Sequence, residues 1–229
     1  MSTEPTAVDP TARNWIWRAF QLFMQNLFVF VFRYRIRGAE QLPPGGALLL
    51  INHQSFIDPL VVAVSFHRPV SYLARHNLFA VPLIGTILRN TYVMPIRRNS
   101  AATESIRMAI NRLQQGYYVG IFPEGTRSTD GRLHEMKPGF LAIVRRANVP
   151  VVPIGVAGAG NALPRGAVMI RPRVVRVVVG TPYSADDVRE FLDQGRAAEF
   201  MESLQVRLQD AMDEAAAWTS GELPSPPLS

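Results

Sequence analysis

The sequence predicts an α/β protein with a mixed central sheet covered by helices, and three observations carry this prediction. Short apolar runs of strand length alternate along the chain with longer segments of helical periodicity. One run, "ALLLIN" at 47–52, is apolar at almost every position, as in a strand buried on both faces. Clusters of glycine and proline, such as "LPPGG" at 42–46, separate the segments. With 229 residues, 48% of them apolar, the chain can build one sizeable core.

The individual elements follow from local patterns. Strands are predicted where alternating or continuous apolar residues meet turn signals, at 31–38, 47–52, 71–75, 91–96, 117–122, 150–158 and 173–180. Helices are predicted where apolar residues recur at helical spacing, at 14–26, 59–66, 82–89, 100–116, 139–149 and from Ser184 onward. The helix at 100–116 has the clearest pattern, because its apolar residues share one face and Gly116 can end it.

The N-terminal segment "NWIWRAFQLFMQN" predicts a helix with one narrow polar stripe, formed by Asn14, Arg18, Gln21 and Gln25. Seven of the fifteen phenylalanine and tryptophan residues lie before residue 33. A helix that spans a bilayer needs about 20 mostly apolar residues, so the polar side chains favour an amphipathic helix lying in the membrane interface. The alternative is an amphipathic helix that packs on the protein's own core.

The chain is expected to divide into four parts. Residues 1–32 form a tail and the membrane-interface helix, and residues 33–183 form the α/β domain that carries the chemistry. Residues 184–217 form acidic C-terminal helices, and residues 218–229 form a disordered tail. The first fourteen residues lack the basic start and apolar stretch of a secretory signal.

Charge is distributed unevenly around a net value of +6. Through residue 185 there are 21 basic and 8 acidic residues, and beyond it 3 basic and 10 acidic ones. A basic body predicts anionic partners such as phosphate esters or anionic lipid, and scattered arginines without a recognisable motif disfavour nucleic acid. Of the 24 basic residues only Lys137 is lysine, which reflects either codon usage or bidentate phosphate recognition. Because cysteine is absent, disulfides, zinc–thiolate sites and cysteine nucleophiles are excluded.

The loop "NHQSFI" lies between a predicted buried strand and a helix that starts near Asp58-Pro59. Asp58 suits the N-cap and Pro59 the first helical position. If the loop folds back, one imidazole nitrogen of His53 can meet the Asp58 carboxylate. A carboxylate bonded to one ring N–H fixes the tautomer and leaves the other nitrogen as a base.

Other interpretations of this pair remain open on the residues alone. His53 can be a buried histidine with satisfied hydrogen bonds, and Asp58 can be only a helix cap. Two ligands without a further cluster do not make a metal site, so no metal is expected. Ser55 lacks the glycine-flanked elbow of a serine nucleophile.

The segment "IFPEGTRSTDGRLHEMKPG" (121–139) predicts a strand followed by a tight turn at Glu124, Gly125, Thr126 and Arg127, with Lys137 further on. An arginine on a glycine-containing loop beside hydroxyl groups makes a phosphate cradle. Glu124 is unexpected beside an anion, and we interpret it as pinning the arginine or meeting a substrate hydroxyl. The alternative is an ordinary surface turn.

Taken together, these motifs resemble those of the 1-acylglycerol-3-phosphate acyltransferases, the PlsC-like glycerolipid acyltransferases. "NHQSFIDP" is similar to the family's His-x4-Asp motif, "FPEGTRS" to its third motif and "VPVVPIGV" to its fourth. The region 74–98 is similar to the second motif, including Arg98. It departs at Arg75, Asn77 and Tyr92, where the family usually has lysine, glutamate and a nearby glycine, and these changes concern the substrate preference.

The resemblance implies a direct acyl transfer without a cofactor or a covalent acyl-enzyme. His53 would act as general base on the free hydroxyl of lysophosphatidate, oriented by Asp58, and the acyl chain would come from acyl-CoA or acyl-carrier protein. The product would be phosphatidate for phospholipid synthesis. The resemblance, together with the glycine-containing loop, assigns the acceptor's phosphate to a set of residues: Arg98, Glu124, Gly125, Thr126 and Arg127, with Arg75 and Lys137 as further candidates.

Two other functions are also compatible with the sequence. One is acylation of a different acceptor, such as glycerol 3-phosphate or a lyso-aminolipid. The other is non-catalytic binding of anionic lipid by the basic body. For the enzyme, an amphiphilic acceptor and the aromatic N-terminal helix predict a peripheral, monotopic protein on the cytoplasmic face of the membrane, in contact with anionic lipid.

Overall fold

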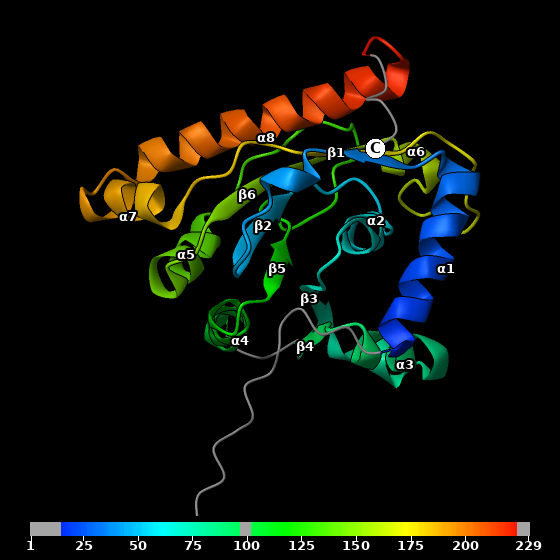
Figure 1. Cartoon of the computed structure of the whole chain (residues 1–229), viewed down its shortest axis with the longest axis horizontal. Helices are drawn as coiled ribbons and strands as arrows, with labels where there is room; N and C mark the ends of the chain where they lie inside the picture. The colour runs from blue at the N-terminus through cyan, green and yellow to red at the C-terminus, as the bar shows by residue number, and fades with distance from the viewer. Residues whose placement is uncertain (1–14, 97–101, 224–229) are drawn as a thin grey trace, which may run out of the picture.

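A computed structural model describes residues 15–96 and 102–223, which are built around one seven-stranded sheet (Figure 1). The strand order is β1-β7-β6-β2-β5-β3-β4, and every neighbouring pair is parallel except β6 and β7. The prediction of a mixed central sheet covered by helices is confirmed. The strands are β1 (Arg35–Arg37), β2 (Ala47–Ile51), β3 (Val70–Arg75), β4 (Met94–Ile96), β5 (Tyr118–Ile121), β6 (Val151–Ala157) and β7 (Arg176–Val179).

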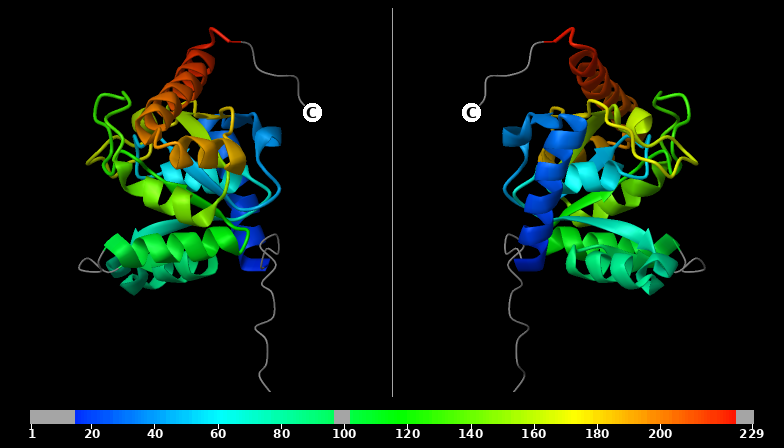
Figure 2. Two further views of the ribbon diagram at one scale, coloured as in Figure 1. Left: turned by 90° about the vertical axis from the view of Figure 1, so that its left-hand side faces the viewer. Right: turned by 90° about the vertical axis from the view of Figure 1, so that its right-hand side faces the viewer.

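Helices cover both faces of the sheet (Figures 1 and 2). One face packs against α1 and α2, and the other against α4, α5, α7 and α8. The α-helices are α1 (Trp15–Phe32), α2 (Asp58–Ser65), α3 (Pro82–Asn90), α4 (Ala102–Gln114), α5 (Leu141–Ala147), α6 (Ala159–Ala162), α7 (Ala185–Asp193) and α8 (Ala197–Ser220). Short 3-10 turns are η1 (Ala39–Gln41), η2 (His76–Ala80) and η3 (Pro138–Phe140).

The central strand β2 explains how the site is assembled. All five of its residues are buried, as the continuous apolar run predicted. β2 lies between β5 and β6 and is parallel to both, so the carboxyl ends of these three strands meet at one edge of the sheet. The loops that follow parallel strands at such an edge are the usual place for a ligand site.

Helix α1 turns part of its predicted polar stripe toward the core, while Arg18 of the same stripe is exposed. Two members of that stripe point inward: Gln21 Nε2 donates to the carbonyl of Phe66 at 2.7 Å, and Gln25 Nε2 to that of Val64 at 2.6 Å. These carbonyls lie at the end of α2, where no helical N–H remains to satisfy them. Helix α1 therefore both packs on the core of the protein and carries an apolar outer surface.

The inner and outer faces of α1 differ in burial. Trp17, Phe28 and Phe32 are buried in the core, whereas Phe23 is 66% and Phe30 83% exposed. The predicted strand at 31–38 starts later, at β1, because its first residues still belong to α1. Among the described helices, none is both long and apolar enough to cross a membrane.

The C-terminal helices pack closely on the antiparallel end of the sheet. α8 runs across β6 and β7, and Gly155 allows this approach, since a Cβ there would lie 2.2 Å from the carbonyl oxygen of Ala211. α8 continues to Ser220, and Trp218 is buried, so the prediction of a disordered tail from residue 218 is wrong for this stretch. Residues 224–229 of that predicted tail lie outside the described part of the chain.

Candidate active site

His53 and Asp58 contact each other directly, as predicted. His53 Nδ1 donates to Asp58 Oδ2 at 2.9 Å, which leaves Nε2 as the free base in the neutral ring. The same Oδ2 accepts the backbone N–H groups of Gln54 and Ser55, each at 2.7 Å. The loop between β2 and α2 is thus wrapped around one carboxylate oxygen.

Asp58 differs in one detail from the prediction of an N-cap. α2 begins at Asp58 itself, Ile57 occupies the cap position, and the carboxylate turns back onto the preceding loop. Asp58 is fully buried, and burial raises the pKa of its carboxyl, while the hydrogen bonds that it accepts act in the opposite direction. A buried carboxylate beside an imidazole is well placed to stabilise the imidazolium that forms when the ring takes up a proton.

The imidazole of His53 is also held from one side by a stack of aromatic rings. The Phe122 ring lies 4.0 Å from it, centroid to centroid, at 25°. Behind Phe122 lies Tyr72, at 6.1 Å and 15°. Gly120 makes room for this ring, since a Cβ there would lie 2.3 Å from an atom of the Tyr72 ring. The sequence motifs alone did not point to Phe122 or Tyr72, although Phe122 begins the "FPEGTRS" motif.

Glu124 joins the loop that carries His53 to the loop that carries Arg127. Its Oε1 accepts the backbone N–H of His53 at 2.9 Å, and its Oε2 accepts that of His134 at 3.1 Å. The side chain is buried, and no ion pair links it to Arg127. The interpretation of Glu124 as a partner of Arg127 is therefore wrong for this structure, whereas a contact of Glu124 with a substrate hydroxyl stays a prediction.

We expect Glu124→Ala to lower the free energy of unfolding by about 1–3 kcal/mol, since two N–H groups lose a charged acceptor. Urea denaturation measures this, with the exposed Glu135→Ala as the matched control. A Glu124→Ala protein of unchanged stability but with a raised KM for the acceptor would instead support the ligand-binding interpretation.

The remaining residues of the second loop lie at the same edge of the sheet. Ser128 N donates to the carbonyl of His53 at 2.7 Å, so Arg127 is one residue away from the join between the loops. Arg127 is half-buried, and its guanidinium has no hydrogen bond or ion pair with any described residue. Gly125 has φ 70°, and Lys137 Nζ lies over it, 2.8 Å from where a Cβ would stand.

Three other residues were predicted to contact the acceptor, and the structure shows the following of each. Thr126 is exposed on the loop beside Arg127. Arg75 ends β3, whose carboxyl end lies at the same edge as that of β5, and only its backbone is described. Arg98 lies outside the described residues. Of the described candidates, Arg127 and Lys137 therefore lie on the segment that is hydrogen-bonded to the backbone of His53.

A family model described as "Acyltransferase" matches residues 33–157, more than half of the chain. The chain belongs to the acyltransferase family. The resemblance drawn from the motifs is confirmed, and both the His53 loop and the Arg127 loop of this acyltransferase lie within the matched residues.

Two relatives of this acyltransferase carry the same described activity. It is 29% identical to "1-acyl-sn-glycerol-3-phosphate acyltransferase LPAT1, chloroplastic" of Arabidopsis thaliana, over 79% of this chain and 53% of that protein. It is 25% identical to the 1-acyl-sn-glycerol-3-phosphate acyltransferase of Bacillus subtilis (strain 168), over 77% and 86%. The chain spans about half the length of the plant and algal relatives that it matches.

One solved structure shares the fold of this acyltransferase. The crystal structure of the 1-acyl-sn-glycerophosphate (LPA) acyltransferase PlsC from Thermotoga maritima matches with a TM-score of 0.65. The match covers 83% of this chain and 80% of that chain at 23% sequence identity, so it shows the fold alone.

Proposed function

We propose that the chain transfers an acyl group from an acyl thioester, acyl-CoA or acyl-carrier protein, to the free hydroxyl of lysophosphatidate, giving phosphatidate for phospholipid synthesis. The observation that carries this proposal is the His53–Asp58 pair at 2.9 Å, joined through the backbone of His53 to the loop that presents Arg127. The activity named for the relatives supports the choice of acceptor.

In the proposed mechanism, His53 Nε2 takes the proton of the acceptor hydroxyl as its oxygen attacks the thioester carbonyl. A C–O bond forms, the C–S bond breaks, and the imidazolium returns its proton to the leaving thiolate. Asp58 stabilises the imidazolium and keeps the ring in the required tautomer. No side chain needs to carry the acyl group. Ser55 is buried, and its hydroxyl already donates to the carbonyl of Leu163 at 2.8 Å.

The acceptor's phosphate is proposed to bind Arg127 and Lys137, with Arg75 and Arg98 as further contacts from their positions in the chain. Gly125 and Thr126 would form the rest of the cradle. An arginine offers a planar fork that matches two phosphate oxygens, which a lysine cannot do.

Arg127→Ala is expected to raise the KM for lysophosphatidate roughly 10- to 100-fold, because one charge-assisted contact with the phosphate is lost. The KM for the acyl donor should stay unchanged, and Arg127→Lys should restore part of the loss. Steady-state kinetics with each substrate varied measures these values, with the exposed Arg132→Ala as the control on the same loop. An unchanged acceptor KM would remove Arg127 from the phosphate site.

The choice of acceptor and donor is tested by a radiolabelled acyl-transfer assay. We expect turnover with lysophosphatidate and little with glycerol 3-phosphate or a lyso-aminolipid. Running acyl-CoA and acyl-carrier protein in parallel identifies the donor. Preferred turnover of another acceptor would reassign the substrate, and no turnover with any would favour a non-catalytic lipid-binding protein.

We further propose a peripheral, monotopic association with the cytoplasmic face of the membrane through the outer face of α1. Trp15, Leu22, Phe23 and Phe30 are between 58% and 83% exposed on this helix, which contains no acidic residue. Aromatic and aliphatic side chains beside arginine suit the interface of a bilayer that contains anionic lipid.

Leu22→Asp combined with Phe23→Asp is expected to lower binding to lipid vesicles by roughly tenfold or more, because two apolar side chains no longer enter the interface. Co-sedimentation with vesicles measures it. Deleting the helix is not a suitable test, since Trp17, Phe28 and Phe32 belong to the core. Equal binding of the variant and the unchanged chain would contradict the anchoring role of α1.

A further inference from the structure

The loop between α6 and β7, residues 163–175, carries an apolar tip that no described residue covers. Val168, Met169 and Ile170 are 97%, 79% and 50% exposed. Three consecutive large apolar side chains in water form a patch of the kind that marks a contact surface. We call this segment the tip loop.

The base of the tip loop is fixed to two parts of the molecule that matter for function. Ser55 Oγ, in the loop between His53 and Asp58, donates to the carbonyl of Leu163 at 2.8 Å. At the other end, Val175 N donates to the carbonyl of Phe32, the last residue of α1, at 3.0 Å. The tip loop therefore begins beside the loop that carries His53 and Asp58 and ends beside the proposed membrane helix, on one side of the molecule (Figures 1 and 2).

The tip is surrounded by positive charge. Arg165, Arg171 and Arg173 are exposed within the loop, and Arg33 follows α1. None of them forms an ion pair with a described carboxylate, and the sequence contains no acidic residue from 136 to 185. An apolar tip flanked by unpaired arginines is complementary to an anionic bilayer, where acyl chains lie beneath phosphate groups.

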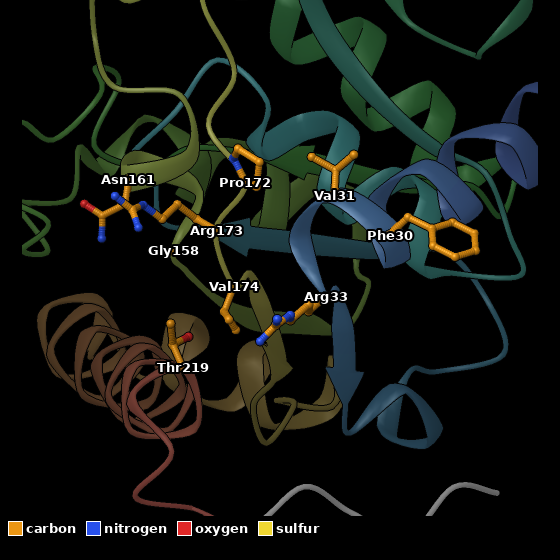
Figure 3. A pocket seen from close by; sticks show the side chains of 9 residues that line it. All are labelled: Phe30, Val31, Arg33, Gly158, Asn161, Pro172, Arg173, Val174 and Thr219. Atoms are coloured by element: carbon orange, nitrogen blue, oxygen red, sulfur yellow. The ribbon is translucent and has the colours of Figure 1, made fainter.

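A pocket of about 530 Å³ lies between the end of α1 and the part of the tip loop that leads into β7. Figure 3 shows Arg33 and Arg173 on different walls of this pocket, with Asn161 and Thr219 also lining it. Two guanidinium groups from distant parts of the chain can thus reach the same headgroup region. The two arginines can therefore form direct hydrogen bonds with phosphate oxygens in addition to a long-range electrostatic attraction.

We propose that the tip loop is a second membrane contact, which inserts Val168, Met169 and Ile170 into the interface of a bilayer containing anionic lipid while its arginines bind headgroup phosphates. Together with α1 it would fix the orientation of the enzyme on the bilayer, and the hydrogen bond from Ser55 to the carbonyl of Leu163 ties the loop between His53 and Asp58 to this contact. The orientation matters for acyl transfer only if the proposed function is correct, so this part of the proposal rests on that function. The membrane contact of the tip loop does not depend on it.

The absence of cysteine allows a site-specific test in the full chain. Met169→Cys is labelled with an environment-sensitive nitrobenzoxadiazole dye and mixed with phosphatidylcholine vesicles, with and without phosphatidylglycerol. The matched control is Val206→Cys, a 54% exposed apolar position on α8. We expect a blue-shifted, brighter signal from position 169 with the anionic vesicles and no change from position 206. A water-like signal from position 169 on protein that sediments with the vesicles would overturn the proposal.

Two substitution sets separate the apolar and the electrostatic parts of the contact. Val168→Asp with Met169→Asp is expected to lower partition into anionic vesicles roughly tenfold, against no change for Val206→Asp. Arg165→Gln and Arg171→Gln are each expected to lower it about fivefold with anionic vesicles only, and added salt should shrink that difference. Unchanged partition for both sets would overturn the proposal.

Two further outcomes are distinguishable. If the tip instead binds a second copy of the chain, the position-169 signal will change without vesicles, and analytical ultracentrifugation will show a dimer that Val168→Asp abolishes; this overturns the membrane assignment. If acyl transfer to lysophosphatidate fails while the position-169 probe enters anionic vesicles, the proposed activity is wrong and the membrane contact stands, because neither vesicle measurement depends on turnover.

Discussion

His53→Ala should lower kcat for acyl transfer by roughly 10²- to 10⁴-fold, the usual worth of a positioned general base. The reason is local: Nδ1 is committed to Asp58, so Nε2 is the nitrogen left to accept the acceptor's proton. Binding of lysophosphatidate should persist, since the proposed phosphate contacts come from the other loop. Initial-rate kinetics and an equilibrium binding measurement give both values.

A matched control for this variant is His67→Ala, which removes an exposed histidine after the far end of α2. It is expected to keep the unchanged chain's kcat. If His53→Ala retains full turnover, general-base catalysis by this residue is refuted, whereas loss of binding together with turnover would show that the ring is needed to shape the acceptor site.

Asp58→Asn should also reduce kcat, by roughly 10²-fold or more, because a neutral amide cannot stabilise the imidazolium and can favour the wrong tautomer. The control is Asp130→Asn, an exposed carboxylate that contacts His134 at 3.2 Å. Turnover close to that of the unchanged chain would mean that the buried charge is not needed for the reaction.

The same substitution has an opposite expected effect on stability. Burial raises the pKa of Asp58 in the folded state, so the folded chain holds this proton more tightly than the unfolded chain. The corresponding contribution to the free energy of unfolding is present below the unfolded pKa and is lost as the pH rises through the raised value. At neutral pH, urea should therefore unfold Asp58→Asn at the same or a higher concentration than the unchanged chain, and a clear drop would show that the hydrogen bonds of the carboxylate outweigh its burial.

Strand and motif assignments could be predicted well from the sequence because they depend on local patterns. The continuous apolar run of β2 is buried along its whole length, and the turn after it places His53 against Asp58. The helix that follows starts within one residue of the predicted position. These features involve residues close in sequence, where propensity and spacing decide the conformation.

Features that depend on distant partners could not be predicted. No local pattern shows that Gln21 and Gln25 donate to the carbonyls that end α2, so their inward orientation in α1 could not be predicted. Likewise, the Glu124 carboxylate accepts hydrogen bonds from backbone N–H groups of two separate segments, and the spacing of residues in the sequence does not reveal these contacts.

Tyr92, where the sequence departs from the motif of the resembled family, has an unusual backbone conformation. It stands near a position where the resembled family usually has glycine, and its φ is 63°, in the left-handed region that glycine adopts most easily. Its ring lies 6.2 Å from that of Trp17 and 5.8 Å from that of Tyr117. Packing against these rings accounts for an aromatic side chain being kept in an unfavourable backbone conformation.

The placement of β2 between β5 and β6 has a consequence for biosynthesis. The polypeptide leaves the ribosome from its N-terminus, so His53 and Asp58 emerge long before the strands on either side of β2. A nascent chain that ends before Val151 lacks β6, and one that ends before Ala197 lacks the helix covering β6 and β7. The sheet around β2 can therefore form only after residues as far along the chain as Val151–Ala157 have been made, and a product terminated before them would carry His53 without β6 beside the strand that positions it.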